Sequence, residues 1–437
     1  MNPLLMGRSK NLLLVSAMAV ACGDPGGRDD GSGGGTGITT VNPTMSGGSG
    51  EGTESNEGSG AVDGTATAGT DDGNNGTKFD LGVSPDGGAG GCDGGGGGGG
   101  GGAPDFSYIW IANSAEGTVS KIDTQTMVEL GRYIVRPDAN GNPSRTSVNL
   151  NGDMVIANRS GGITKIYARA EDCPDPANTS TGPGDVKPWP DGCVAWHTPM
   201  AYASQRPVAW TQGTFNNATC RYDDTKVWTS GANATIDVIL VDGETGMIEQ
   251  TVPIPGVAPN FYGIYGGAVD AAGNFWGSQL GQGQLIRVRL NDFSVSTWGM
   301  ATSGYGMTVD HQGNVWTCSS NVARFDPATE TWMTNSVGGS GGCMEDGQGT
   351  LWMANDPMVG VDINTLQVVQ TIDLPNYVHG ISIDFYGYVW GPAIYNNEAY
   401  RVDPVAGTID TITGLNFPYT YSDMTGFALS NATGPIG

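Results

Sequence analysis

The stretch SGYGMTVDHQGNVWTCSSNVARFDPATETW, residues Ser303 to Trp332, decides the fold of this chain. It opens with an apolar run, continues through an Asp310-x-x-Gly313 turn into a segment centred on Trp316, and then passes through two further segments separated by an Asp326-Pro327 turn. Short apolar and aromatic segments bounded by turn residues are typical of β-strands joined by hairpins. We therefore predict that this stretch forms one four-stranded antiparallel sheet.

Variants of the same stretch recur after residue 104. A tryptophan recurs in the second strand of most units, at Trp110, Trp228, Trp276, Trp316, Trp352 and Trp390. In the second unit Val155 takes this position. The turn before it repeats as Asp270-x-x-Gly273, Asp310-x-x-Gly313, Asp346-x-x-Gly349 and Asp384-x-x-Gly387. The last four tryptophans are 40, 36 and 38 residues apart, a period that suits the four-stranded blades of a β-propeller.

Seven units can be counted, and the two ends of the chain complement each other. The first unit begins at Tyr108-Ile109-Trp110 without a preceding strand, whereas the chain ends with Gly426 to Ser430, which looks like a first strand without successors. We predict an all-β, seven-bladed β-propeller in which this C-terminal strand completes the N-terminal blade and leaves no open edge. A six-bladed ring with a frayed C-terminal tail is the alternative.

The first 104 residues have a different composition and lie outside the predicted propeller of residues 105–437. Arg8 and Lys10 precede an apolar segment, residues 11–21, that is too short to span a bilayer permanently, so residues 1–21 are predicted to be a signal peptide. The sequence Ala19-Val20-Ala21-Cys22 resembles a bacterial lipobox, in which the cysteine is lipidated. An ordinary secretory signal cleaved near Ala21 is the alternative, and the choice between inner and outer membrane stays open.

Residues 22–104 are dominated by glycine, serine, threonine and aspartate, and we expect them to form a disordered tether. Both parts of the chain are acidic: residues 23–104 hold 12 acidic and 2 basic residues, and residues 105–437 hold 32 acidic and 15 basic residues. This charge, −25 in total, argues against nucleic acid as a partner. We expect a monomer attached to a membrane through its N-terminal lipid.

Export would place the cysteines in an oxidising compartment. Cys318 lies two residues after Trp316, and Cys343 falls on the first strand of the next unit, so we predict a Cys318–Cys343 disulfide between adjacent blades. The pairing of the remaining cysteines is left open; they are Cys92, Cys173, Cys193 and Cys220. Three of these lie in an insertion at about residues 170–222, which either carries binding residues or forms a disulfide-linked cap on a blade.

The units Gly306–Trp316 and Gly380–Trp390 resemble the G-I-x-x-D-x-x-G-x-x-W repeat of streptogramin B lyases, such as virginiamycin B lyase, and of related NHL-type propellers. The first unit, Ile109–Asp123, also resembles YVTN-type repeats. The lyase resemblance implies a propeller fold and a Mg²⁺-assisted ring-opening elimination that uses two histidines and a glutamate.

Only His379 matches these three catalytic positions, because Gly341 and Ile394 occupy the other two. Acid–base chemistry by that route would lack a partner. Enzymatic activity therefore stays uncertain, and we lean against it.

The residues before the first strand of each unit are expected to surround one mouth of the propeller axis. Those aligned with His379 are Ser144, Tyr265, Tyr305, Gly341 and Thr425. Polar and aromatic side chains in such a ring suit a sugar, a peptide or a small aromatic ligand. For His379, a purely structural hydrogen-bonded role is the alternative.

No cofactor is expected, although a Mg²⁺ or Ca²⁺ ion remains an option. The other histidines, His197 and His311, fall in the insertion and in a turn, so no three-histidine metal site is predicted.

From these features we predict an exported, membrane-anchored lipoprotein at the cell envelope whose propeller binds an unknown small-molecule, glycan or protein ligand. One alternative is a lyase-like or hydrolytic enzyme that uses His379 with Glu398 or Asp423 and a divalent ion. A purely structural surface protein is the other alternative.

Overall fold

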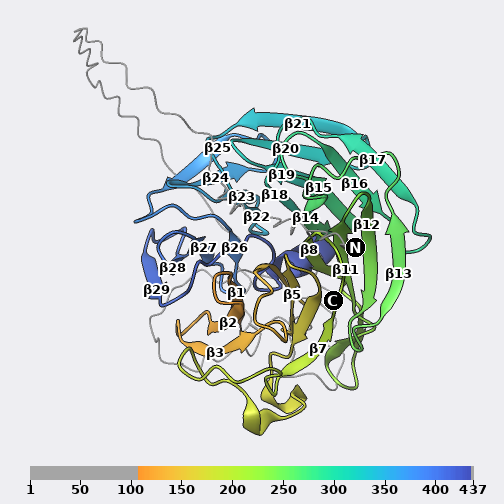
Figure 1. Ribbon diagram of the computed structural model, residues 1–437. Helices are drawn as coiled ribbons and strands as arrows, with labels where there is room; N and C mark the ends of the chain where they lie inside the picture. Colours follow the sequence, from red (N-terminus) through yellow and green to blue (C-terminus); the bar gives the residue numbers. More distant parts are fainter. Residues whose placement is uncertain (1–106, 435–437) are drawn as a thin grey trace, which may run out of the picture. The chain divides into compact units, whose positions relative to one another are not determined.

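The computed structural model describes residues 107–434, which form seven β-sheets arranged around a central axis (Figure 1). The predicted all-β, seven-bladed propeller is confirmed, and the six-bladed alternative is wrong. The predicted signal peptide, Cys22, the tether and Cys92 lie outside the described residues.

Blade 1 has three strands, and blades 2 to 4 have four each. The strands of blade 1 are β1 (Tyr108–Asn113), β2 (Thr118–Asp123) and β3 (Glu129–Ile134). Those of blade 2 are β4 (Pro143–Val148), β5 (Met154–Asn158), β6 (Ile163–Ile166) and β7 (Val194–Thr198). Blade 3 contains β8 (Ser204–Trp210), β11 (Lys226–Ala232), β12 (Ile236–Asp242) and β13 (Ile248–Pro253). Blade 4 contains β14 (Ile264–Val269), β15 (Phe275–Gln279), β16 (Gln284–Val288) and β17 (Val295–Gly299).

Blades 5 to 7 repeat the same antiparallel order. Blade 5 contains β18 (Gly306–Val309), β19 (Val315–Cys318), β20 (Asn321–Asp326) and β21 (Thr331–Ser336). Blade 6 contains β22 (Cys343–Glu345), β23 (Thr350–Met353), β24 (Met358–Asp362) and β25 (Val368–Ile372). Blade 7 contains β26 (Ser382–Ile383), β27 (Val389–Ala393), β28 (Glu398–Val402) and β29 (Ile409–Thr413). The first strand of blades 2 to 7 lies nearest the axis.

The repeated Asp-x-x-Gly-x-x-Trp pattern is explained by one buried hydrogen-bond motif. In blade 5, one oxygen of Asp310 accepts the backbone N–H groups of Gln312 and Asn314, and the other accepts the indole N–H of Trp316 at 2.8 Å. Gly313 closes the turn with φ +82°, a backbone conformation that residues other than glycine rarely adopt. The same aspartate–indole bond joins Asp270 to Trp276, Asp346 to Trp352 and Asp384 to Trp390.

The ring is closed by the segment of residues 416–424, which lies beside β1 as the innermost element of blade 1. The backbone N–H of Trp110 donates to the carbonyl of Met424 at 2.9 Å, and Asn113 forms an antiparallel bridge with Pro418. On its other side the segment meets β4, where the N–H of Thr146 donates to the Ser422 hydroxyl. The C-terminal chain therefore completes the N-terminal blade, as predicted, but with residues upstream of those expected.

The segment predicted as the closing strand, Gly426 to Ser430, instead begins the helix α1 (Phe427–Thr433). Gly426 has φ +88°, which turns the chain away from β1. The carboxylate of Asp423 then accepts the backbone N–H groups of Gly426 and Leu429, which satisfies donors at the start of the helix. Gly434, also at positive φ, follows the last helical residue, as is common at helix C-termini.

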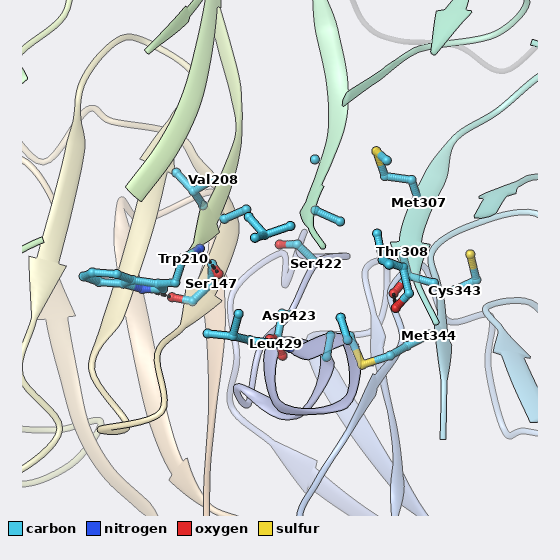
Figure 2. Close-up of a pocket in the computed structure, with 17 residues that line it drawn as sticks. Ser147, Val208, Trp210, Met307, Thr308, Cys343, Met344, Ser422, Asp423 and Leu429 are labelled. Carbon is cyan, nitrogen blue, oxygen red and sulfur yellow. Dashed lines mark hydrogen bonds between the residues drawn. The ribbon is translucent and has the colours of Figure 1, made fainter. Parts of the chain in front are cut away.

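Helix α1 lies in the central channel of the ring (Figure 1). Its Phe427 packs with blade 7, its Leu429 with Val208 of blade 3, and its Ala432 with Met307 of blade 5. A cavity of about 40 Å³ remains between the helix and the inner strands, with Asp423 and Leu429 on its helix side (Figure 2). The channel is therefore filled at the end where the inner strands finish.

The insertion is split in two and lies at that same end of the ring. A loop with two short 3₁₀ turns, η1 (Ala170–Asp172) and η2 (Pro176–Asn178), joins β6 to β7. The hairpin β9 (Thr214–Asn216) and β10 (Arg221–Asp223) joins β8 to β11 and bonds to Asn151 in the turn after β4. Both parts of the insertion therefore leave the blades at the end of the ring where the inner strands finish.

Two disulfides join described cysteines. Cys318 of β19 is bonded to Cys343 of β22, so the predicted link between blades 5 and 6 is present in the structure. Cys173 and Cys193 close the loop between β6 and β7. Cys220 is also disulfide-bonded. Within residues 107–434, no helix combines the length and the hydropathy needed to span a lipid bilayer.

The aspartate–indole motif gives a stability prediction. Replacing Asp310 by alanine leaves the indole N–H and two turn amides without their acceptor inside the protein, so we expect a loss of about 2–4 kcal/mol in the free energy of unfolding. Urea unfolding followed by tryptophan fluorescence measures this change. Asp326→Ala is the control, because Asp326 accepts similar turn bonds at an exposed position. Equal losses in the two variants would contradict the role given to the buried motif.

Candidate functional site

Side chains from several blades and from the closing segment meet at the end of the axis where the inner strands begin. Arg145 belongs to β4, Arg206 to β8 and Tyr265 to β14, while Tyr305 and His379 directly precede the inner strands of blades 5 and 7. Arg159 follows β5, and the closing segment supplies Tyr419 and Tyr421. We call these eight residues the axial cluster: Arg145, Arg159, Arg206, Tyr265, Tyr305, His379, Tyr419 and Tyr421.

Three tyrosine hydroxyls of the axial cluster form a closed triangle of hydrogen bonds. The hydroxyl of Tyr265 lies 3.1 Å from that of Tyr305 and 2.7 Å from that of Tyr419, and the hydroxyls of Tyr305 and Tyr419 also bond to each other. Burial raises the pKa of Tyr419 to about 12 and raises that of Tyr305 well above its usual value. These phenols are therefore neutral near pH 7 and can both donate and accept hydrogen bonds.

His379 is held between two tyrosines. Its Nε2 bonds to the hydroxyl of Tyr305, and its Nδ1 lies 2.8 Å from the hydroxyl of Tyr377. Burial, together with the nearby Arg145 and Arg159, lowers the pKa of His379 to about 3. The imidazole is therefore neutral at physiological pH, so it donates one hydrogen bond and accepts another.

The three arginines stack on the tyrosine rings. The guanidinium of Arg145 lies 3.1 Å from the ring centre of Tyr421, and that of Arg159 lies 4.0 Å from the ring centre of Tyr419. The guanidinium of Arg206 lies 4.8 Å from the ring of Tyr265. Such cation–π contacts place the charges without neutralising them.

The axial cluster has a buried floor and an accessible upper layer. Arg145 is 1% exposed, and Tyr265 and Tyr421 are also buried. The other members are only partly buried, and they are Arg159, Arg206, Tyr305, His379 and Tyr419. The cluster is therefore open to solvent at the mouth, and α1 fills the channel at the other end.

Exposed aromatic residues surround this mouth. Phe261, just before β14, is 82% exposed, and Tyr395, just after β27, is 71% exposed. Phe417 lies near the start of the closing segment and stacks on Tyr419 at 6.2 Å between ring centres. Phe261 has φ +67° and Phe417 has φ +50°, a region that is rare for bulky residues. Strained backbone and exposed aromatic rings together are typical of binding surfaces.

The structure brings together Tyr265, Tyr305 and His379, as the alignment of the repeats suggested, but not Ser144 and Thr425. Ser144 is fully buried, and its hydroxyl has no hydrogen-bond partner among the described residues. Thr425 lies beyond the closing segment, where its hydroxyl bonds to the carbonyl of Ile383. The expectation that these two line the mouth fails. In blade 2 the residue at the mouth is Arg145, one position after Ser144, and in the closing segment it is Tyr421, four positions before Thr425.

The arginines and the closing tyrosines are the site residues that the repeat alignment missed. In blade 2, the side chain that joins the axial cluster belongs to Arg145, the neighbour of Ser144. Arg206 opens the inner strand of blade 3, which the large insertion concealed. Tyr419-Thr420-Tyr421 has the alternation of a strand, and this signal was available in the sequence.

The positions that the lyase resemblance would require hold no acid–base group. A Cβ atom at Gly341 would come within 2.4 Å of the carbonyl oxygen of His379, so no larger side chain fits there. Ile394 is buried. Asp423 binds the start of α1, and Glu398 is bound by Asn376 and Tyr400, so neither carboxylate contacts His379 in the described structure.

No group of three or more metal-ligating side chains is found within the described part of the chain, residues 107–434.

The fold and the site define a β-propeller with a polar and aromatic axial mouth. A protein of unknown function from Desulfotomaculum acetoxidans is similar over 72% of this chain and 98% of its own, with a TM-score of 0.53 and 10% identity. A putative 6-phosphogluconolactonase from Bacteroides uniformis is similar over 74% of this chain and 98% of its own, with a TM-score of 0.50 and 12% identity. Virginiamycin B lyase from Staphylococcus aureus is similar over 62% of this chain and 84% of its own, with a TM-score of 0.48 and 13% identity.

At these identities the similarity concerns the fold alone. No protein-family model matches the chain. No curated protein matches it either.

The lowered pKa of His379 predicts how stability depends on pH. In the unfolded chain this histidine binds a proton below about pH 6.5, whereas in the folded protein it does so only near pH 3. Between these values the unfolded state holds more protons, so the free energy of unfolding falls as the pH is lowered from about 6.5 towards 3. We expect His379→Gln to lose less stability than the wild type over this range.

Urea unfolding of both proteins at several pH values tests this expectation. Burial raises the pKa of Asp384 and of Asp423 to about 6, which gives the opposite slope. Both proteins share these carboxyls, so the difference between the two curves isolates His379. Parallel curves would contradict the prediction.

Proposed function

We propose that this protein is an exported, lipid-anchored binding protein of the cell envelope whose axial cluster recognises a ligand. The ligand enters at the mouth where the inner strands begin and rests on the buried floor formed by Arg145, Tyr265 and Tyr421. A small molecule, a glycan end or a protruding segment of a protein all suit an opening of this kind.

The observation that carries the proposal is the layered arrangement of the axial cluster. Partly buried hydroxyl, imidazole and guanidinium groups converge at one open end of the axis, and exposed aromatic rings surround them. Binding sites commonly combine aromatic walls with a few convergent polar groups. The helix α1 gives this opening a closed base, so a ligand would contact side chains from several blades at once.

The chemistry of the cluster favours binding over catalysis. A group with a pKa of about 3 is a weak base at neutral pH, and a general base works best when its pKa lies near the working pH. The phenols of Tyr305 and Tyr419 are weak acids there because burial raises the pKa of each. Hydrogen bonding and stacking are the tasks that these residues can perform without changing their protonation state.

The disulfides support the proposed compartment. Cys318–Cys343 and Cys173–Cys193 would persist in an oxidising environment and would be reduced in most cytoplasms. The lipid anchor at Cys22 and the tether rest on the sequence patterns described above. In this proposal the tether carries the propeller away from the membrane surface.

The binding proposal is tested with His379→Ala. We expect ligands found in a thermal-shift screen of glycans, peptides and small aromatic compounds to raise the melting temperature of the wild type and to do so much less in the variant. The loss of His379 removes the group that joins Tyr305 to Tyr377. The same samples are assayed for lactone opening with and without Mg²⁺. Metal-dependent turnover that disappears in the variant would contradict the binding role and support an enzyme.

The anchor is tested separately. Cells expressing the wild type should incorporate labelled palmitate into the protein, and Cys22→Ala should not, because the thiol is the proposed attachment point. Membrane fractionation of both proteins provides the parallel measurement. Absence of label from the wild type would remove the lipid anchor from the proposal.

A further inference from the structure

We propose that the axial cluster is an anion site, and that its ligand is an organic acid whose carboxylate or phosphate group is bound by Arg145, Arg159 and Arg206 while its ring stacks on the aromatic residues of the mouth. This inference rests on the proposed binding function and specifies the chemical class of the ligand.

The first argument is that the three guanidinium groups have no carboxylate partner. Within the described residues, five other arginines form ion pairs with acidic side chains, whereas these three, like Arg287, Arg289 and Arg324, do not. Arg145 donates one hydrogen bond, to the carbonyl of Tyr421, and Arg159 donates one, to the side chain of Asn142. The chain has 32 acidic residues after position 104, yet none of the described ones forms an ion pair with these three arginines.

The second argument is the number of buried donors that remain without an acceptor. The Nε and Nη2 atoms of Arg145, the Nε and Nη2 atoms of Arg159 and the Nε atom of Arg206 are buried and lack a hydrogen-bond partner in the described structure. Arg145 itself is 1% exposed. Buried donors on a charged group are costly unless they are paired, so their presence at an open mouth indicates a place for an external acceptor. Guanidinium groups match the oxygens of carboxylates and phosphates with two parallel bonds.

The third argument is that the cluster already stabilises negative charge on one of its own members. Burial acts to raise the pKa of Tyr421, but Arg145, Arg206 and Arg159 outweigh this effect, and the pKa lies below its usual value. The positive potential of the three arginines, together with a hydrogen bond from Tyr265, therefore more than offsets the effect of burial on the pKa of this phenol.

The fourth argument concerns the body of the ligand. At the mouth, Tyr419 and Tyr377 are each stacked with a more exposed ring, Phe417 and Tyr395 respectively. Phe261 is held at positive φ in an exposed position on the blade 4 side. Aromatic faces of this kind stack on aromatic rings and on the apolar faces of sugars. In a ligand whose acid group is attached directly to a ring, the acid group would contact the arginines while the ring contacts the aromatic residues of the mouth.

The test compares matched pairs of probes that differ in charge. Benzoate is compared with benzamide, phenyl phosphate with phenol, and glucuronate with glucose, each by titration calorimetry and, for weak binding, by saturation-transfer NMR. We expect the acid of at least one pair to bind about tenfold or more tightly than its neutral partner, because charge-assisted bonds to guanidinium are strong. The pair that shows the effect identifies the oxyanion and the ring.

Variants of the two accessible arginines locate the effect. The double variant Arg159→Gln/Arg206→Gln should abolish the preference for the acid, and rising salt should weaken binding to the wild type. Arg145 is avoided because it is buried and its loss would disturb the floor. Arg289→Gln is the matched control, because Arg289 is an exposed arginine that follows β16 at the opposite end of blade 4. Circular dichroism and thermal unfolding confirm that each variant is folded.

The outcomes separate this inference from the binding function itself. Acids that bind no better than their neutral partners, or equally well to the double variant, would overturn the anion site. Failure of every acid to bind would overturn it as well. A neutral ligand whose binding needs His379 but not Arg159 or Arg206 would overturn the anion site and leave the proposed binding function standing.

Discussion

The backbone pairing of Trp110 with Met424 is the constraint on which the rest of the molecule depends. It joins the first strand to the closing segment and so converts an open row of sheets into a ring. Because the segment lies between β1 and β4, it also determines where Tyr419 and Tyr421 stand. The chain that leaves it then turns at Gly426 into the central channel as α1. The position of the closing segment thus accounts for the closed ring, for the tyrosines at the mouth and for the helix in the channel.

The parts of the fold that could be predicted are those encoded within a single blade. The Asp-x-x-Gly-x-x-Trp pattern is local, because the aspartate, the turn amides and the indole lie within seven residues of one another. Its repetition is enough to count the blades and to place Cys318 and Cys343 on neighbouring blades. The short apolar segment after Gly426 could not be assigned in the same way. Its helical state depends on Asp423 and on contacts with several blades at once.

The candidate site was predictable only in part, for a related reason. Tyr265, Tyr305 and His379 occupy equivalent positions in regular blades, so alignment of the repeats finds them. Arg206 begins a blade whose other strands are separated by an extra hairpin, and the repeat cannot be aligned there by spacing alone. Arg159 comes from the turn after β5 and joins the cluster only through the curvature of the ring. Such convergence of residues from different blades is a property of the closed structure.

The pairing that closes the ring also sets the order in which the molecule can be completed. Trp110 and Met424 are separated by 314 positions along the chain, so blade 1 has no inner partner until residues 416–424 have been synthesised. Contacts between residues so distant in sequence form slowly, and the earlier blades wait with an unpaired edge. The ring of the nascent chain therefore stays unclosed until residues 416–424 have emerged from the ribosome.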